Sequence, residues 1–182
     1  MYRYSDLKIR KFTKDDIPNK IKWINDSKNN TYLHYDLPLE YEKTLNWFER
    51  TKDRDDRFDA VIEYNGTPVG LVGLLNIDMK NMKAEDYIIV GEHKYKGKGI
   101  ATRAGHLIQL YAFEILNLNK VYAYTEVDNE KAIKLDLRRG FEIEGCLKSD
   151  LCMNGRYIDR YCLGVYKSNY IKPKDVYFEE CF

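Results

Sequence analysis

The residues best suited to chemistry lie in one basic, glycine-containing stretch, residues 91–102 (GEHKYKGKGIAT). The apolar residues 87–90 precede it, and apolar residues recur at helical spacing over residues 100–115, which predicts a strand, a tight loop and a helix. The first turn of a helix carries unpaired backbone N–H groups and the positive end of the helix dipole. Gly97 and Gly99 let the backbone approach a ligand closely, and neighbouring lysines add charge. This combination suits a pyrophosphate.

Two common phosphate-binding loops do not match this stretch. A Walker A loop has four residues between its first glycine and its Gly-Lys-Ser/Thr end. Here five residues separate Gly91 from Gly97, and Gly99 stands where Ser or Thr should be. The Rossmann pattern needs glycine or alanine where Thr102 stands. On these residues alone, the remaining alternative is a basic turn that uses glycine only for its geometry.

Residues 84–102 resemble motif A of the GNAT acetyltransferases, whose loop reads Arg/Gln-x-x-Gly-x-Gly/Ala. Lys94 stands at the Arg/Gln position, and Gly97 and Gly99 match. Three further motifs of the family follow in order: Asn129-x-x-Ala132, Gly140-Phe141 with Glu144-Gly145, and Asn154-Gly155-Arg156-Tyr157-x-Asp159. The resemblance covers about residues 8–167. It is to the branch that includes ribosomal-protein N-terminal, diamine and nucleotide-amino-sugar acetyltransferases.

The resemblance implies an α+β fold with a mixed, mostly antiparallel sheet, helices on both faces, and splayed fourth and fifth strands (residues 84–90 and 120–127). It implies acetyl-CoA as the cosubstrate, with the pyrophosphate on the backbone of residues 96–102 and the pantetheine amides on residues 88–90. Asn129 should contact the pantetheine arm, although asparagine also caps helices well. The residues expected to bind acetyl-CoA are Ile88, Ile89, Val90, Lys94, Lys96, Gly97, Lys98, Gly99, Ile100, Ala101, Thr102 and Asn129.

Acetyl transfer also needs a group that takes the proton of the ammonium, because an amine with a pKa of about 10 is almost fully protonated at neutral pH. Glu85 lies on the fourth strand, where the resembled branch often carries a glutamate, and is the expected proton acceptor. Asp86 should face the other way by strand alternation. The alternative for both is a solvent-facing strand carboxylate. The resemblance further implies that a backbone N–H of this strand polarises the thioester carbonyl.

The group that protonates the leaving thiolate is where this chain departs from the family. The family commonly reads Asn-x-x-Ala-x-x-Leu-Tyr, and that tyrosine donates the proton, whereas here Asp136 follows Leu135. An ordinary aspartate, with a pKa of about 3.9, is ionised at neutral pH and would need burial and a raised pKa to donate. Either Asp136 does so, or a tyrosine such as Tyr122 or Tyr124 replaces it, or the thiolate leaves unaided. Asp136 could instead bind a cationic amine.

The acceptor is predicted to be the primary amine of a small molecule, either an amino sugar or polyamine-like, which attacks directly in a ternary complex. In the resembled family, the region between the first two helices covers the acceptor pocket. Tyr32, His34 and Tyr35 lie there and are predicted to contact the acceptor, with plain anchoring of the loop as the alternative. Two other functions stay open: a protein N-terminal (ribosomal-protein-type) acetyltransferase, and an acyl-CoA-binding module with weak catalysis, which Asp136 permits.

These residues must be positioned by elements that hydrophobic periodicity and turn residues predict. Asn65-Gly66 and Asn154-Gly155 are turn signals between strands, and Gly140 ends a helix. The predicted strands are residues 7–12, 58–64, 68–77, 84–90, 120–127, 157–166 and one that begins at 141. The predicted helices are residues 13–24, 40–51, 100–115 and 129–139. This order indicates a single domain over residues 1–167, with a tail over 168–182.

Composition sets limits on the remaining function classes. The chain has 182 residues, and its net charge of +1 gives no argument for nucleic acid as a partner. No apolar run approaches the roughly 20 residues of a membrane span, and the first residues lack the apolar region of a signal peptide, so we expect a cytoplasmic protein that does not bind membranes. The four cysteines are expected to be reduced, and no metal site is expected. A homodimer is a further expectation.

Overall fold

The computed structural model describes residues 2–178, and within them nine strands form one sheet in the order β7-β8-β6-β5-β4-β3-β2-β1-β9. All neighbouring strands are antiparallel except β5 and β6, which are parallel. The strands are β1 (Tyr2–Arg3), β2 (Leu7–Lys11), β3 (Phe58–Tyr64), β4 (Thr67–Asp78), β5 (Lys83–Val90), β6 (Lys120–Glu126), β7 (Glu142–Met153), β8 (Arg156–Tyr166) and β9 (Tyr177–Phe178).

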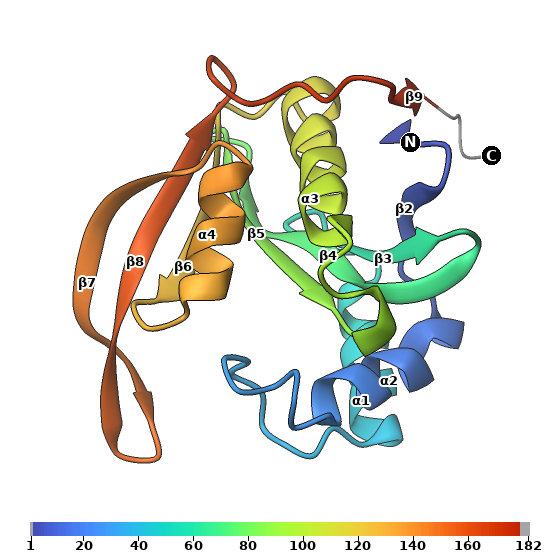
Figure 1. Cartoon of the computed structure of the whole chain (residues 1–182). Coiled ribbons are helices and arrows are strands. Elements are labelled where there is room, and N and C mark those ends of the chain that lie inside the picture. The colour runs from blue at the N-terminus through green and yellow to red at the C-terminus, as the bar shows by residue number, and fades with distance from the viewer. Residues whose placement is uncertain (1, 179–182) are drawn as a thin grey trace.

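Four α-helices cover the two faces of the sheet: α1 (Ile17–Asn25), α2 (Tyr41–Thr51), α3 (Ile100–Leu110) and α4 (Glu130–Arg138). The first predicted helix begins as a 3₁₀ turn at Lys14–Asp16, and the third ends in a π-helical turn at Tyr111–Ile115. The helices α3 and α4 lie on one face, and α1 and α2 lie on the other (Figure 1). No helix in the described part of the chain is long and apolar enough to cross a membrane.

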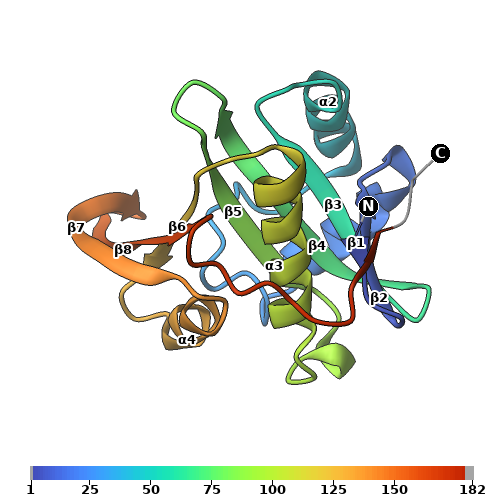
Figure 2. The same cartoon turned by 90° about the horizontal axis from the view of Figure 1, so that it is seen from above.

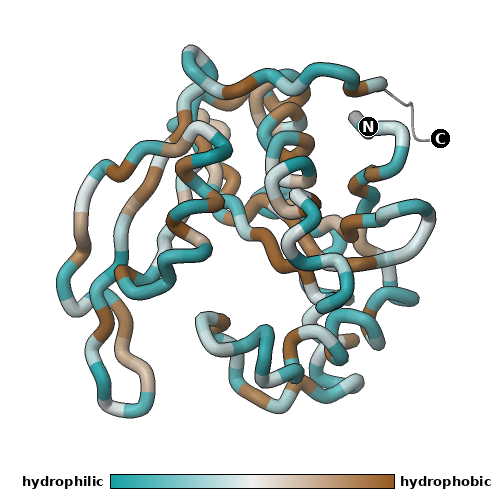
Figure 3. Tube along the Cα trace, viewed as in Figure 1, coloured by the Kyte–Doolittle hydropathy of each residue, from teal (hydrophilic) through white to brown (hydrophobic). Residues whose placement is uncertain are grey.

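The core has two layers, one on each side of the sheet. The larger layer joins α3 to strand residues such as Ile62 and Val72, and the smaller joins α1 and α2 to Val61 and Leu71. Neighbouring strand residues thus alternate between the two layers, as the pleat requires. Figure 3 shows the hydrophobic positions concentrated in α3 and the central strands, whereas the β7–β8 hairpin mixes both kinds.

The parallel pair β5–β6 is the structural feature on which the site depends. Its pairing covers only Lys83–Glu85 with residues 120–122, and the two strands then diverge (Figure 1). Since β4 pairs with β5 as far as Val90, one edge of β5 stays in the sheet while the other opens toward β6. We call this divergence the fork. The predicted GNAT arrangement, with its splayed fourth and fifth strands, corresponds to β5 and β6.

The described part of the predicted tail packs on the domain. It crosses α3 and brings β9 beside β1, with Phe178 opposite Tyr2 and Tyr177 opposite Arg3 (Figure 2). The ring of Tyr170 lies 4.8 Å from that of Phe113, centroid to centroid. Residues 179–182, which include Cys181, lie outside the described residues. The other three cysteines form no disulfide.

Candidate active site

The predicted pyrophosphate loop has the backbone that close approach of a ligand requires. Gly97 and Gly99 have φ angles of 77° and 72°, and a Cβ added at either would meet no atom within 4 Å. The N–H groups of residues 97–102 donate to no backbone carbonyl in the described chain. Lys96 differs from expectation, because its N–H donates to the His93 carbonyl oxygen at 3.1 Å in a 3₁₀ turn. The loop therefore offers a cluster of free donors beside the start of α3, which fits a pyrophosphate.

The lysines of the loop are held in different ways. The ammonium groups of Lys94 and Lys98 lie 4.9 and 5.3 Å from the centroid of the Tyr95 ring. The Lys96 ammonium donates to the side-chain oxygen of Asn29, whose amide nitrogen in turn donates to the Gly91 carbonyl at 3.0 Å. The segment that follows α1 is therefore bonded directly to the loop.

On the face of the sheet opposite α3, the structure brings Glu85 and Tyr122 together at the fork. They are in register across the β5–β6 pair, and the Glu85 carboxylate accepts a hydrogen bond of 2.9 Å from Asn76. Burial raises the pKa of Glu85 despite that bond, and burial together with Glu85 raises the pKa of Tyr122. The rings of Tyr122 and Tyr124 pack edge to face at 5.6 Å. A half-buried carboxylate of raised pKa suits a proton acceptor.

A group of charged side chains lies at the fork on the face of the sheet that α3 and α4 cover. The sequence did not indicate it. Arg139 donates to Asp86 at 2.5 Å and to Asp136 at 2.5 Å, and the side chains of Arg139 and Asp86 are each only 1% exposed. The second oxygen of Asp136 accepts from the Thr125 hydroxyl at 3.2 Å. We call Asp86, Arg139, Asp136 and Thr125 the fork clamp. It joins β5, β6 and α4 where the β5–β6 ladder has ended.

One expectation about these carboxylates needs correction. Asp86 does face away from Glu85, but it is buried and paired rather than solvent-facing. Asp136 has a cation of the same chain, Arg139, as its partner, and its role in the reaction stays a prediction. Burial raises the pKa of Asp136, and Asp86 adds to the shift, whereas Arg139 opposes it. Asp136 and Tyr122 therefore lie on opposite faces of the sheet at the fork.

Arg139 reaches the fork because α3 makes room for it. A Cβ at Gly105 would lie 2.3 Å from the Arg139 side chain, so only glycine allows this approach. Gln109 of α3 donates to the Arg139 carbonyl at 3.1 Å. A glycine inside a strongly helical stretch was the one sequence signal that could have indicated this contact.

Asn129, the last predicted cofactor residue, caps α4. Its side-chain oxygen accepts from the Ala132 N–H at 3.2 Å. This is the capping role that was the alternative to contact with pantetheine, and the two are compatible because an amide also carries donors. Contact with pantetheine stays a prediction.

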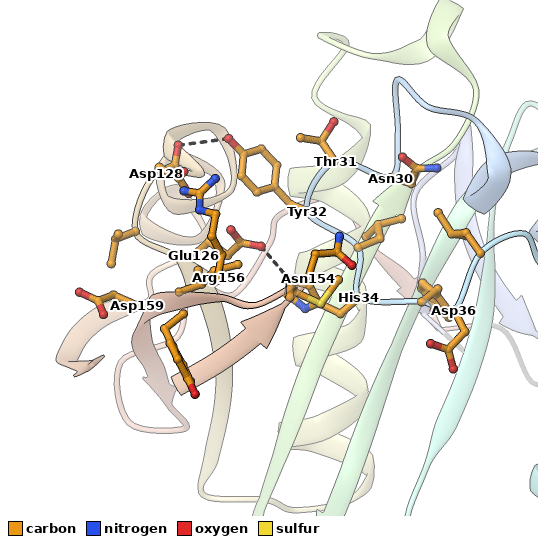
Figure 4. Close-up of a pocket in the computed structure, with 17 residues that line it drawn as sticks. Asn30, Thr31, Tyr32, His34, Asp36, Glu126, Asp128, Asn154, Arg156 and Asp159 are labelled. Atoms are coloured by element: carbon orange, nitrogen blue, oxygen red, sulfur yellow. Dashed lines mark hydrogen bonds and ion pairs between the residues drawn. The ribbon is translucent and has the colours of Figure 1, made fainter. Parts of the chain in front are cut away.

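The three predicted acceptor residues, Tyr32, His34 and Tyr35, line one cavity of about 900 Å³ beside the fork. Its walls are residues 30–37, residues 126–128 at the end of β6, and residues 153–159 of the β7–β8 hairpin (Figure 4). His34 Nε2 lies 2.7 Å from Glu126 Oε1, and the Tyr32 hydroxyl donates to the Asp128 carbonyl at 3.4 Å. These contacts also anchor the loop to β6.

Acidic side chains outnumber basic ones in the lining of the cavity. Four carboxylates line it, against one arginine: Asp36, Glu126, Asp128 and Asp159, with Arg156. Asp159 is held by Lys148 at 2.7 Å, and Glu126 by His34. The cavity therefore has an acidic, partly aromatic lining, and its loop wall continues from the segment that is bonded to the pyrophosphate loop.

Comparisons with known proteins agree with this geometry. The family model described as "Acetyltransferase (GNAT) domain" matches residues 6–142. The spermidine N(1)-acetyltransferase of Escherichia coli K12 is 31% identical over 170 residues, which is 91% of this chain and 88% of that protein. A putative ribosomal N-acetyltransferase of Bacillus subtilis is 35% identical over 143 residues, 76% of this chain and 73% of that protein. A crystal structure of a Vibrio cholerae spermidine N-acetyltransferase with CoA and spermine matches with a TM-score of 0.83 at 28% identity, covering 91% of this chain and 98% of that one.

The chain belongs to the GNAT acetyltransferase family. The predictions of the GNAT fold, of an N-acetyltransferase and of acetyl-CoA as its cosubstrate are confirmed.

Proposed function

We propose that the protein transfers the acetyl group of acetyl-CoA to a primary amine of a polyamine-like molecule that carries two or more ammonium groups. The acidic lining of the cavity beside the fork carries this proposal, because several carboxylates favour a multiply charged cation over a neutral or anionic acceptor. Two of the similar proteins are named for spermidine, and one of them was crystallised with spermine.

In this proposal the chemistry is divided between the cavity, β5 and the loop. The cavity carboxylates hold the ammonium groups that do not react, and Glu85 takes the proton of the one that does. The neutral amine attacks the thioester carbonyl, the new C–N bond forms, and the C–S bond breaks with its electron pair on sulfur. Residues 97–102 hold the pyrophosphate, and residues 88–90 hold the pantetheine amides. A raised pKa of Glu85 supports its role, because a stronger base accepts the ammonium proton more readily.

A protein N-terminus is the second candidate acceptor, and the similarity to a putative ribosomal N-acetyltransferase favours it. A peptide would need the cavity to accommodate a backbone rather than an extended cation. The homodimer, the cytoplasmic location and the division into residues 1–167 and 168–182 stay predictions.

The test is a steady-state comparison of acceptors by release of the CoA thiol. We expect kcat/KM for a triamine to exceed that for a monoamine of equal length by about tenfold at low salt, since each added ion pair contributes on the order of 1 kcal/mol. Asp128→Asn should raise KM for the triamine severalfold and leave KM for the monoamine nearly unchanged.

Glu130→Gln is the matched control, because Glu130 is exposed, pairs with Lys134 at 2.7 Å and does not line the cavity. Preference for an amino sugar or for a ribosomal N-terminal peptide over every polyamine would contradict the proposed acceptor.

A further inference from the structure

Lys20 is a buried cation that the proposed reaction does not use. It follows Ile17 by three residues and precedes Ile24 by four, and this spacing places all three side chains on the buried face of α1. Only 6% of Lys20 is exposed. A buried lysine normally has a carboxylate partner, because an unpaired charge is costly to remove from water.

Aromatic rings surround the Lys20 ammonium instead. It lies 3.2 Å from the centroid of the Trp47 ring and 5.8 Å from those of Phe12 and Tyr35. These rings come from α2, from the residue after β2, and from the loop over residues 30–37. The face of an aromatic ring attracts a cation, and the attraction is stronger where water is excluded. We call Trp47, Phe12 and Tyr35 the lysine box.

The carboxylate whose charge acts on Lys20, Asp59, is already bound by other groups. It accepts from Arg57 at 2.6 and 2.9 Å and from the Tyr87 hydroxyl at 2.6 Å. Burial lowers the pKa of Lys20 to about 8, while Asp59 opposes the shift and Arg57 adds to it. Burial also raises the pKa of Tyr35 and of Tyr87, so both hydroxyls are neutral. Lys20 is therefore mainly protonated at neutral pH, and the rings of the box hold its charge.

Tyr35 connects the lysine box to the cavity beside the fork, because it belongs to the box and also lines the cavity. The same wall of the cavity, residues 30–37, is bonded to the end of β6 through His34 and to the residues after β6 through Tyr32. The wall is thus held toward β6 on one side and toward α1 on the other. On the side of α1, the contact is that of Tyr35 with Lys20.

We propose that Lys20 is a positioning residue of the acceptor cavity, whose ammonium holds Tyr35 against α1 and so keeps residues 30–37 in the form that binds the amine. Lys20 acts through Tyr35, since it does not itself line the cavity. A wall that is ordered beforehand costs less to order when the amine binds, so Lys20 lowers KM for the acceptor and leaves kcat nearly unchanged. This role rests on the proposed function, because it requires the amine to enter this cavity.

The first test needs no acceptor. In Trp23→Phe protein, Trp47 is the one remaining tryptophan, and its fluorescence reports on the lysine box. The emission should change with a midpoint near pH 8 as Lys20 loses its proton, and Lys20→Met should abolish the change. Lys43→Met should keep it, because Lys43 is an exposed lysine of α2 that pairs with Glu40 at 2.9 Å. A change that survives in Lys20→Met, or no change at all, overturns the proposal. If Trp23→Phe does not fold, the emission of both tryptophans is compared with and without Lys20→Met.

The second test separates positioning from general structural support. Lys20→Met should raise KM for a triamine about fivefold at pH 7 and leave kcat and KM for acetyl-CoA within about twofold. From pH 7 to 9, KM of the unmodified protein should rise toward that of Lys20→Met, so that the ratio of the two approaches one. A merely structural loss would keep this ratio constant, and that result counts against the proposal. Lys43→Met should match the unmodified protein throughout. If Lys20→Met does not fold, Trp47→Leu, which removes the ring at 3.2 Å, takes its place.

The third test asks whether Lys20 acts through Tyr35. Tyr35→Leu should raise KM for the amine, and adding Lys20→Met to it should raise KM no further, because the two residues make one contact. Fully additive effects would exclude this route. If an amino sugar or a peptide N-terminus proves to be the better acceptor, the proposed function fails. The same KM ratios are then measured with that amine, and the fluorescence result is unaffected.

Discussion

Glu85 and Asp86 are neighbours in the chain, yet they lie in two different environments on the two faces of one sheet. Glu85 is half-buried, accepts from a neutral amide and lies beside Tyr122. Asp86 is buried, binds a guanidinium and lies below α3 and α4. One strand can therefore carry a half-buried carboxylate and a buried, ion-paired carboxylate side by side, since the pleat places consecutive side chains in separate surroundings.

The two faces also differ in how much stability depends on them. At Glu85 there is one hydrogen bond to a neutral amide to lose, whereas the fork clamp contains buried charges that cannot be left unpaired without a large cost. Substitution of Glu85 should therefore change the rate at nearly constant stability, and substitutions in the fork clamp should change stability as well.

Removing the cation of the clamp should have the largest effect. Arg139→Met leaves two buried carboxylates without their partner and should lower the free energy of unfolding by about 3–5 kcal/mol at neutral pH. The loss should shrink in acid, because protonated carboxyl groups need no cation. Urea unfolding at several pH values measures this. The matched control is Arg103→Met, which breaks a half-exposed pair with Asp6 and should cost at most about 1 kcal/mol. Equal losses for both variants would remove the distinction between the faces.

Removing the carboxylate of Glu85 should change the reaction rate rather than the stability. Glu85→Gln should lower kcat/KM by about a hundredfold at the acidic end of the range, where few amines are already neutral, and less at high pH. In the unmodified protein the rate should fall with decreasing pH as Glu85 takes up a proton, and its raised pKa moves that fall to higher pH than for an ordinary glutamate. Steady-state rates of Glu85→Gln and of the unmodified protein from pH 6 to 9 test this prediction. Glu63→Gln, which removes a strand carboxylate paired with Arg10 elsewhere, is the control.

A substitution in the predicted pyrophosphate loop should change only the affinity for acetyl-CoA. It should leave the surroundings of Glu85 and the fork clamp unchanged. Gly99→Val should weaken acetyl-CoA binding by about tenfold, because a side chain would occupy the space that a ligand needs and the positive φ angle disfavours valine. Calorimetry measures the affinity. Gly66→Val is a suitable control, since Gly66 also has a positive φ angle and open space but lies in the β3–β4 turn. An unchanged affinity in Gly99→Val would refute the role of the loop.

The sequence was informative wherever local chemistry decides the structure. Glycines with positive φ angles mark the turn after Asn65, the loop at Gly97 and Gly99, and the end of α4 at Gly140, and each was predicted. The strand order and the divergence of β5 from β6 came from the resemblance to the family, since loop signals alone do not state which strands pair.

Buried charges were the part that the sequence could not reveal. Arg139 lies at the C-terminal end of α4, where a cation is common. It is buried because it packs on Gly105 and pairs with Asp86, which are both distant in the sequence. Lys20 is a second example, because its ammonium lies 3.2 Å from the centroid of the Trp47 ring, and burial lowers its pKa to about 8. Nothing in the spacing of α1 and α2 distinguishes this lysine from an exposed one. Whether a charged residue is buried depends on tertiary neighbours.

The pairing of β1 with β9 has a consequence for the synthesis of the protein. More than 160 residues separate the end of β2 from the start of β9, and ribosomes add about 5–20 residues per second. The outer edge of β1 thus stays open for roughly 10 to 30 seconds after it leaves the ribosome. During that interval the nascent chain presents an unpaired strand to its surroundings, and β9 closes it only after every other strand has been made.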